Sequence, residues 1–417
     1  MIASGTQAAD GIRLTLDDLF RRACVRHADA VALADPVRSF TYAEVDRAIS
    51  AMAARLRAFG LATDVVVALQ LPNSVESVIA LLGVSRAGMI AAPLPLLWRQ
   101  QEMVAALSRA GAKAIVTFGA QADVARQAAA ELFPIRAVAG FGRDLPDGVA
   151  ALDDVLTSNN NEFFQPAPRP GTAAAHAATI TFDVIAGGIV LAAHSHSELI
   201  ARGLDVVREA ALGEDIAILS TIPASSFAGI SLTVMPWLLG GGTLVLHPIF
   251  DPAVFVAQCR AHDVAAVAVP GPALPAMADA GLLGAAKTIL ALWRTPEQLA
   301  AAPPWQGRAT LLDVAGFSET GLLASGRGPD GLPRIIAPAA APAGLVAVGG
   351  YRFRAEEIDA AVAAADQSAI IAALPHALLG QRLAGSAPYP ADLATALQAR
   401  GVNALIAGAF RPRGKAA

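Results

Sequence analysis

Two histidines separated by one serine, His194-Ser195-His196, could bring two imidazole rings to one metal ion. A structural zinc site takes about four ligands, and no third ligand lies nearby in the sequence. The same residues also fit the start of a helix, because Ser195 or Ser197 can cap a first turn that contains Glu198. Both interpretations stay open from the sequence, and the helix start is favoured.

The sequence lacks the common motifs for nucleotide binding and for a nucleophilic serine. It contains no G-x-G-x-x-G after a strand, no G-x-x-x-x-G-K-[ST] and no G-x-S-x-G. The run Gly240–Gly242 precedes an expected strand, which is the wrong order for binding phosphate. Only Lys113, Lys287 and Lys415 are lysines. A mechanism that requires a lysine therefore has few candidates.

The composition limits the class of protein. Of 417 residues, 55% are hydrophobic and 16% charged, which excludes disorder and suits two or three domains. A net charge of −4 without a basic run gives little support to nucleic-acid binding. Cys24 and Cys259 define no disulfide framework, and Asp10 and Arg13 interrupt any secretory signal. We therefore expect a cytoplasmic protein.

One long window, 216–250, contains no Asp, Glu, Lys or Arg. It is long enough for a transmembrane helix, but Pro223, Pro236 and Gly240–Gly242 interrupt it and basic flanks are missing. The alternative is a buried strand, turn and helix in an α/β core. We expect the second arrangement and no membrane span.

Strand and helix patterns alternate through the first third of the chain, which predicts a parallel sheet with helices on both faces. Thr41 and Glu44 form a capping box for one helix, and Asn73 and Glu76 are expected to cap the next. The predicted strands are 65–71, 89–93 and 114–118, and the predicted helices are 45–59, 74–88 and 100–109.

Later segments predict a second lobe and a small terminal domain. A polar, proline-bearing stretch at 158–171 precedes the expected strands 177–182, 216–222, 242–246, 264–269 and 288–293. Gly, Pro and Ala dominate 326–350, as in a linker or hinge. Beyond it, 354–364, 369–374, 390–400 and 403–410 follow the order helix, strand, helix, strand. The predicted fold is α/β, a large N-terminal body of two similar α/β lobes (1–165 and 166–325), followed by a linker (326–348) and a small C-terminal α+β domain (349–417).

Four segments, taken in chain order, resemble the core motifs of one family. They are FTYAE at 40–44, SRAG at 85–88 leading to Pro93, GFSETG at 316–321, and GGYRF at 349–353 followed by EEI at 356–358. The chain is similar over nearly its whole length to the adenylate-forming superfamily, which contains AMP-forming acyl-CoA synthetases, luciferases and peptide-synthetase adenylation domains. The resemblance implies ATP and Mg²⁺ as cofactors. It implies a carboxylic acid and CoA, or a carrier-protein thiol, as partners.

The resemblance also implies roles for individual residues. In the family an acid attacks the α-phosphate of ATP, and a thiol then attacks the acyl-adenylate. Ser318 would bind phosphate and Glu319 would bind the metal, with Gly187 and Gly316 as further nucleotide-binding positions. Lys415 is the candidate for the catalytic lysine. The alternatives are a surface loop at 318–319 and a solvated tail at Lys415.

The acid pocket of the family falls on small or apolar residues here. These are Phe227, Gly229, Val314, Ala315 and Gly316. Their character suggests an uncharged acyl or aryl group, and core packing is the alternative role.

The positions that would bind the nucleotide depart from the family pattern. The phosphate loop, typically T-S-G-T-T-G-x-P-K-G-V, falls on 182–192, where only Gly187 matches and Val190 replaces the lysine. Asp183 would face the triphosphate, and each like-charge pair at about 4 Å costs on the order of 4 kcal/mol. The ribose-binding Asp is also missing, since Asp330 lies in a Pro-Asp-Gly turn.

Two hypotheses follow from this departure. The chain is an acyl- or aryl-CoA ligase with a divergent nucleotide site, in which Ser318, Glu319 and Lys415 keep their roles. Alternatively, it is a non-catalytic or repurposed relative that binds the acid or acyl-CoA without ATP-dependent adenylation.

Overall fold

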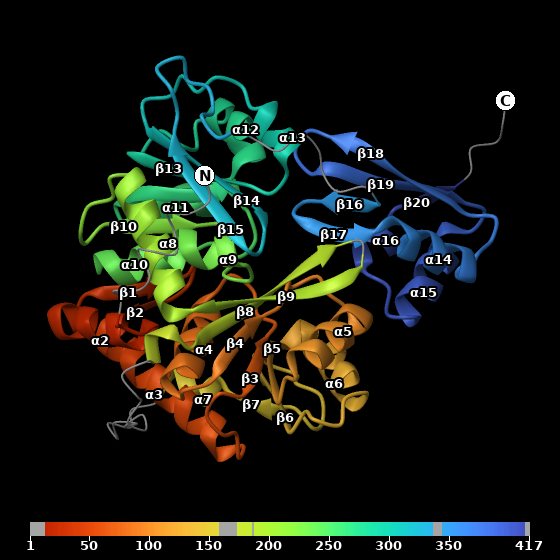
Figure 1. The fold of residues 1–417 in the computed structure, drawn as a ribbon, viewed down its shortest axis with the longest axis horizontal. Coiled ribbons are helices and arrows are strands. Elements are labelled where there is room, and N and C mark those ends of the chain that lie inside the picture. Colours follow the sequence, from red (N-terminus) through yellow and green to blue (C-terminus); the bar gives the residue numbers. More distant parts are fainter. Residues whose placement is uncertain (1–12, 158–172, 186, 337–343, 413–417) are drawn as a thin grey trace.

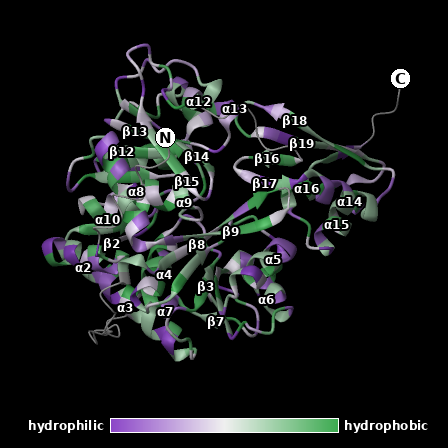
Figure 2. Cartoon of the chain, in the orientation of Figure 1, coloured by the Kyte–Doolittle hydropathy of each residue, from purple (hydrophilic) through white to green (hydrophobic). Residues whose placement is uncertain are grey.

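The computed structural model describes residues 13–157, 173–185, 187–336 and 344–412 (Figure 1). Two large mixed sheets with helices form the body, and a small third sheet with its own helices forms the C-terminal domain. The central strands of the body are strongly hydrophobic (Figure 2), as expected for sheets covered on both faces. The predicted α/β body with a small α+β domain is therefore confirmed.

The first sheet has the order β7-β6-β5-β3-β4-β8-β9 and is parallel except for β9. Its strands are β3 (Val66–Leu69), β4 (Ile90–Pro93), β5 (Ala114–Phe118), β6 (Ala137–Phe141), β7 (Ala150–Ala151), β8 (Ala177–Ile185) and β9 (Gly188–Ser195). The helices of this part are α2 (Leu16–His27), α3 (Tyr42–Ala58), α4 (Val75–Arg86), α5 (Gln100–Ala110), α6 (Ala122–Ala130) and α7 (Asp153–Leu156).

The N-terminal cap of α3 agrees with the prediction from the sequence, and the cap of α4 does not. Thr41 and Glu44 form the predicted capping box. Ser74, not Asn73, is the N-cap residue of α4. The Asn73 amide instead donates to the carbonyl oxygens of Ser220 at 2.8 Å and His247 at 3.2 Å. It therefore links the start of α4 to the second sheet.

The second sheet has the order β15-β14-β13-β12-β10-β11-β1-β2, with the two edge strands antiparallel to their neighbours. Its strands are β1 (Val31–Ala34), β2 (Ser39–Thr41), β10 (Ala217–Ser220), β11 (Leu244–Leu246), β12 (Val264–Pro270), β13 (Thr288–Trp293), β14 (Thr310–Ser318) and β15 (Gly321–Gly326). The helices here are α8 (His196–Glu209), α9 (Phe227–Gly229), the π-helical η3 (Ile230–Val234), α10 (Met235–Gly240), α11 (Pro252–Ala261), α12 (Leu274–Asp279) and α13 (Pro296–Ala300).

Two strand pairings cross the predicted division at 165/166. The strand at 177–182, expected to open the second lobe, is part of β8 and pairs with β4 of the first sheet through Ala91 and Thr179. In the other direction, β1 pairs with β11 of the second sheet. Local periodicity marks a strand but does not name its partner. The two-lobe division by residue number stays a prediction.

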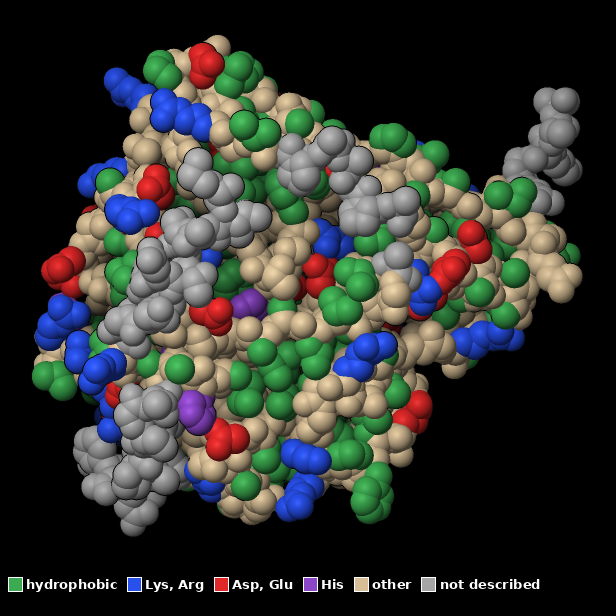
Figure 3. All heavy atoms as spheres, viewed as in Figure 1, with side chains coloured by type: hydrophobic (Ala, Val, Ile, Leu, Met, Phe, Trp, Pro, Cys, Tyr) green, Lys and Arg blue, Asp and Glu red, His purple; other side chains and the backbone are tan. Residues whose placement is uncertain are grey.

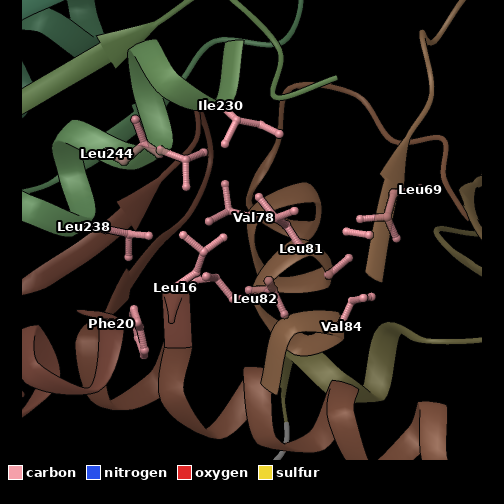
Figure 4. Packing of buried hydrophobic residues seen from close by; sticks show 14 of the residues in the cluster. Leu16, Phe20, Leu69, Val78, Leu81, Leu82, Val84, Ile230, Leu238 and Leu244 are labelled. Carbon is pink, nitrogen blue, oxygen red and sulfur yellow. The ribbon is translucent and has the colours of Figure 1, made fainter. Parts of the chain in front are cut away.

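The two lobes share one hydrophobic core around α4. Every residue of α4 except Ser77 is buried, as is typical of a helix that packs on all sides. Figure 4 shows Val78, Leu81 and Leu82 of α4 among Leu16 and Ile230 from neighbouring helices. Since side chains of both sheets belong to this cluster, the lobes form one packed body.

The uncharged window at 216–250 folds into β10, α9, η3, α10 and β11, and most of its side chains are buried. The expected α/β arrangement is confirmed. None of the helices in the described part of the chain has the length and apolarity required to cross a bilayer.

The C-terminal domain contains a sheet in the order β17-β16-β19-β18, with β20 beside β19. Its elements are β16 (Leu345–Val348), β17 (Tyr351–Arg354), α14 (Ala355–Ala365), β18 (Ile370–His376), β19 (Gly380–Ala387), α15 (Pro390–Ala399), α16 (Ala404–Ala407) and β20 (Phe410–Pro412). The predicted linker therefore includes a strand of this domain at its end. Half of the expected strand at 403–410 is the short helix α16, because the Asn403 side chain accepts from the Leu405 N–H and starts a helix.

Candidate functional site

A cavity of about 660 Å³ lies where the two lobes meet the C-terminal domain. Its walls are mainly apolar, and they include Trp98, Phe250, Met277, Leu292 and Leu378. Gly349 and Gly350 at the predicted hinge also line it, together with four charged residues: Asp183, Arg294, Glu319 and Arg352. Figure 3 shows acidic and basic side chains side by side between the body and the C-terminal domain, next to an apolar area. Its size and lining are typical of a small-molecule site.

Glu319, the expected metal ligand, is occupied by the protein's own donors. It lies in the turn between β14 and β15 and is 2% exposed. Its Oε1 accepts from Arg294 Nη2 at 2.8 Å, and its Oε2 accepts from the Phe227 N–H at 2.7 Å. Both carboxylate oxygens thus have partners within the chain.

Asp183, at the position expected for the phosphate loop, is also paired. Its Oδ1 accepts from Arg352 Nη1 at 2.6 Å and from the Val184 N–H at 2.9 Å. The N–H of Glu319 donates to Oδ2 at 3.4 Å, and Arg352 Nη2 donates to the Phe317 carbonyl oxygen. These contacts join the second lobe, the β8–β9 hairpin and the C-terminal domain.

The segment expected to wrap phosphate continues an antiparallel ladder. Asp183 pairs with Val190, Val184 with Ile189, and Ile185 with Gly188. Gly187 is exposed beside this ladder and is not among the residues that line the cavity.

Of the five expected pocket residues, Phe227, Gly229, Val314 and Ala315 do not line the cavity, and neither does Gly316. Phe227 is buried and stacks on the His194 ring at 4.1 Å. A Cβ at Gly229 would lie 2.2 Å from the Pro223 carbonyl oxygen, so this glycine permits a close backbone approach. Val314 and Ala315 are buried in β14. The described geometry gives all four a packing environment.

The remaining expected site residues are separated. Gly316 is packed, since a Cβ there would lie 2.8 Å from the Ala228 Cβ. The Ser318 hydroxyl shares a hydrogen bond of 3.1 Å with the Thr320 hydroxyl, and Ser318 is not among the cavity-lining residues. Lys415 lies outside the described residues.

The two histidines at 194 and 196 do not converge. His194 Nε2 lies 2.9 Å from the Thr181 hydroxyl, whereas His196 Nδ1 accepts from the Leu16 N–H at 3.2 Å. Burial lowers the pKa of His194, and the nearby Glu319 and Glu198 oppose this shift. The helix start is confirmed, because Ser195 caps α8 in a capping box with Glu198. Within the described ranges, no group of three or more His, Cys, Asp or Glu residues is placed to hold a metal ion.

The charges of the cavity do not fit a magnesium-bound triphosphate. Two arginines face two carboxylates, so these residues bring no surplus of positive charge. Lys113 and Lys287 are not among the lining residues. Adenylyl transfer from ATP requires cations around the phosphates and a free metal ligand.

Arg294 and Arg352 are the functional candidates that the motif search missed. Arg294 directly follows β13 of the parallel sheet, and ligands in such folds bind outside the carboxyl ends of strands. The position of Arg294 directly after a predicted strand could therefore have indicated a ligand-binding residue. No comparable signal singled out Arg352, although it lies within the matched segment 349–353.

Comparison with known proteins finds similarity to one family model and to curated enzymes. Residues 20–182 match the family model described as AMP-binding enzyme. A feruloyl-CoA synthase from Amycolatopsis sp. is 27% identical over 232 residues, which cover 55% of this chain and 43% of that protein. The matched part thus spans less than half of this curated relative.

Solved structures extend the likeness in fold to most of the chain. MbtA from Mycobacterium smegmatis has a TM-score of 0.65 at 20% identity, covering 97% of this chain and 92% of the other. The amide bond synthetase McbA from Marinactinospora thermotolerans has a TM-score of 0.71 at 14% identity and covers 96% of each chain. The family model therefore matches residues 20–182, and nearly the whole chain shares the fold of these solved structures.

Proposed function

We propose that this chain is a repurposed acyl-CoA-ligase-like protein that binds an apolar acyl or aryl carboxylic acid, or its CoA thioester, without ATP-dependent adenylation. The observation that carries the proposal is the state of Glu319, whose two oxygens accept from Arg294 and Phe227. Removing one partner of a buried ion pair is strongly destabilising. Recruiting Glu319 to Mg²⁺ would therefore leave Arg294 without its partner.

The lining of the cavity supports an apolar ligand. Trp98, Met277 and Leu292 offer surfaces for a ring or an alkyl chain. The relative named feruloyl-CoA synthase suggests an aryl acid as the first compound to test. A cytoplasmic location belongs to the same proposal, whereas a CoA or carrier-protein thiol as co-substrate belongs to the ligase alternative below.

The test is pyrophosphate exchange with a panel of acids that includes ferulate, combined with calorimetry of ATP binding. The proposal expects no exchange and no heat of ATP binding at millimolar nucleotide. It also expects a saturable heat with at least one acid of the panel. An active acyl-CoA ligase serves as the positive control.

A second candidate function is a ligase with a divergent nucleotide site. It is favoured by the position of Glu319 beside the hinge residues Gly349 and Gly350 in one cavity. In this case Glu319 binds Mg²⁺, Ser318 contacts phosphate and Lys415 stabilises the transition state. Robust exchange that Glu319→Ala abolishes would establish this function and exclude the first.

A further inference from the structure

One guanidinium in the cavity wall has a nitrogen without a partner. Arg294 Nη2 donates to Glu319, whereas Arg294 Nη1 is buried and has no hydrogen-bond partner among the residues that the structure describes. A buried donor without an acceptor destabilises the folded state, and more so when the donor is charged. Native structures rarely keep such a group without a reason.

Glycines flank the Arg294 side chain on two sides. A Cβ at Gly316 would lie 3.7 Å from Nη1, and a Cβ at Gly350 would lie 3.4 Å from the Arg294 Cγ. With no side chain at either position, neither residue supplies a side-chain acceptor to Nη1. Arg294 lines the cavity, so a ligand bound there can provide the acceptor.

We propose that Arg294 is the residue that binds the ligand's carboxylate, with Nη1 as the donor and the apolar body of the acid in the cavity. This inference rests on the proposed function, because it concerns the ligand of the same site. Glu319 then holds the guanidinium in place through Nη2, and the ligand accepts from the other nitrogen. Arg294 would thus determine specificity for a free acid.

The chain already uses this arrangement of one guanidinium with two carboxylates. Arg38 pairs with Asp35 and with Glu76, each at 2.6 Å. Arg86 pairs in the same way with Asp17 at 2.7 Å and Asp46 at 2.6 Å. A guanidinium carries five N–H donors, so a second carboxylate on Arg294 needs no new chemistry.

The proposal separates free acids from their esters and thioesters. A carboxylate brings a full negative charge and two acceptor oxygens to the guanidinium, whereas an ester offers only a neutral carbonyl oxygen. We expect the acid to bind roughly 10-fold to 100-fold more tightly than its ester. CoA thioesters should also lack the interaction with Arg294, since their acyl carbonyl is bonded to sulfur and is no longer a carboxylate.

The experiment is calorimetry on the full chain with ferulate and octanoate, each against its methyl ester. Arg294→Lys keeps a cation for Glu319 but removes the second nitrogen of the fork, and it should abolish the preference for the acid. Glu319→Gln keeps an acceptor for Nη2 but removes the neighbouring negative charge, so it should tighten acid binding and raise the acid-to-ester binding ratio. Arg38→Lys is the matched control, because Arg38 also joins two carboxylates and is not a cavity residue.

The two cavity variants are expected to change acid binding in opposite directions. Damage to the fold would instead weaken the binding of acid and ester together in both variants. Equal binding of acid and ester by the unaltered chain, or an unchanged ratio in Arg294→Lys, overturns the role of Arg294 and leaves the proposed function standing. Pyrophosphate exchange overturns the proposed function whatever the acid-to-ester ratio is. If neither acid nor ester binds at about 1 mM, which corresponds to only about 4 kcal/mol, both fail.

Discussion

Arg352 and Asp183 lie 169 positions apart in the chain and form an ion pair of 2.6 Å between Nη1 and Oδ1. The two side chains are 18% and 13% exposed, so solvent screens the pair only in part. Arg352 belongs to β17 of the C-terminal domain, and Asp183 to β8 of the body. The pair therefore links the two parts in the wall of the cavity.

We predict that Arg352→Gln loosens the C-terminal domain from the body. Hydrogen exchange should rise in β16 and β17 and at the β8–β9 hairpin, because both ends of the link lose their partner. A double-mutant cycle with Asp183→Asn should give a coupling energy of about 0.5–3 kcal/mol. Arg411→Gln is the control, since Arg411 is exposed and its hydrogen bonds are to Gly408 and Phe410 of its own domain. Unchanged exchange at β8 in Arg352→Gln would contradict the link.

A second prediction concerns Arg86, which lies in one of the segments that match the family. Its guanidinium is 1% exposed and joins Asp17 of α2 to Asp46 of α3. Arg86→Met would remove the cation from Asp46 and leave Asp17 with only the partly exposed Arg21, and we expect a loss of about 3–5 kcal/mol in the free energy of unfolding.

Urea denaturation measures this loss. Arg126→Met is the matched control, because Arg126 forms an exposed pair with Asp123 at 3.3 Å and such pairs contribute about 0–1 kcal/mol. Similar losses in the two variants would show that the buried position of Arg86 does not matter.

Much of the fold could be read from the sequence, and the reason differs between elements. The strand 114–118 and the helix after Thr41 were predicted because periodicity and capping are local. The pairing of β8 with β4 was not, since partner choice depends on contacts that are distant in the chain. Helix α16 was missed because one side-chain cap at Asn403 outweighed an apolar run.

The candidate site was predictable only in part. Glu319 was found because its flanking glycines and neighbours match a motif, and it does line the cavity. The negative charge at Asp183 was noted, but its partner Arg352 comes from another domain and no spacing rule connects them. Phe227 and Gly229 were assigned to a pocket from their apolar character, which buried packing residues share.

A third prediction is that the free energy of unfolding falls below neutral pH, and that protonation of His194 causes part of this fall. Burial lowers the pKa of His194, so the unfolded chain, with an ordinary pKa near 6.5, binds the proton more readily. Stability contributed by neutral His194 is thus present above about pH 6.5 and is lost as the pH falls toward the lowered pKa. His262 acts in the same direction, because burial lowers its pKa as well.

Urea denaturation between neutral pH and mildly acidic pH checks the contribution of His194. In His194→Gln the fall in unfolding free energy should become smaller, since the titrating group is gone. His176→Gln is the control, because the His176 side chain is 53% exposed. The same pH slope in His194→Gln as in the unaltered chain would refute the assignment.

A fourth prediction separates packing from ligand contact at Gly229. A methyl group there would meet the Pro223 carbonyl oxygen at 2.2 Å, and this backbone atom cannot move aside as a flexible side chain can. Gly229→Ala should therefore cost about 1–3 kcal/mol or more in unfolding free energy, with the acid-to-ester binding ratio of the folded fraction unchanged. Gly321→Ala is the matched control, because a Cβ at Gly321 would find no atom within 4 Å. If Gly229→Ala keeps full stability and alters the binding ratio, Gly229 contacts the ligand, and the wall of the binding site extends beyond the described cavity to α9.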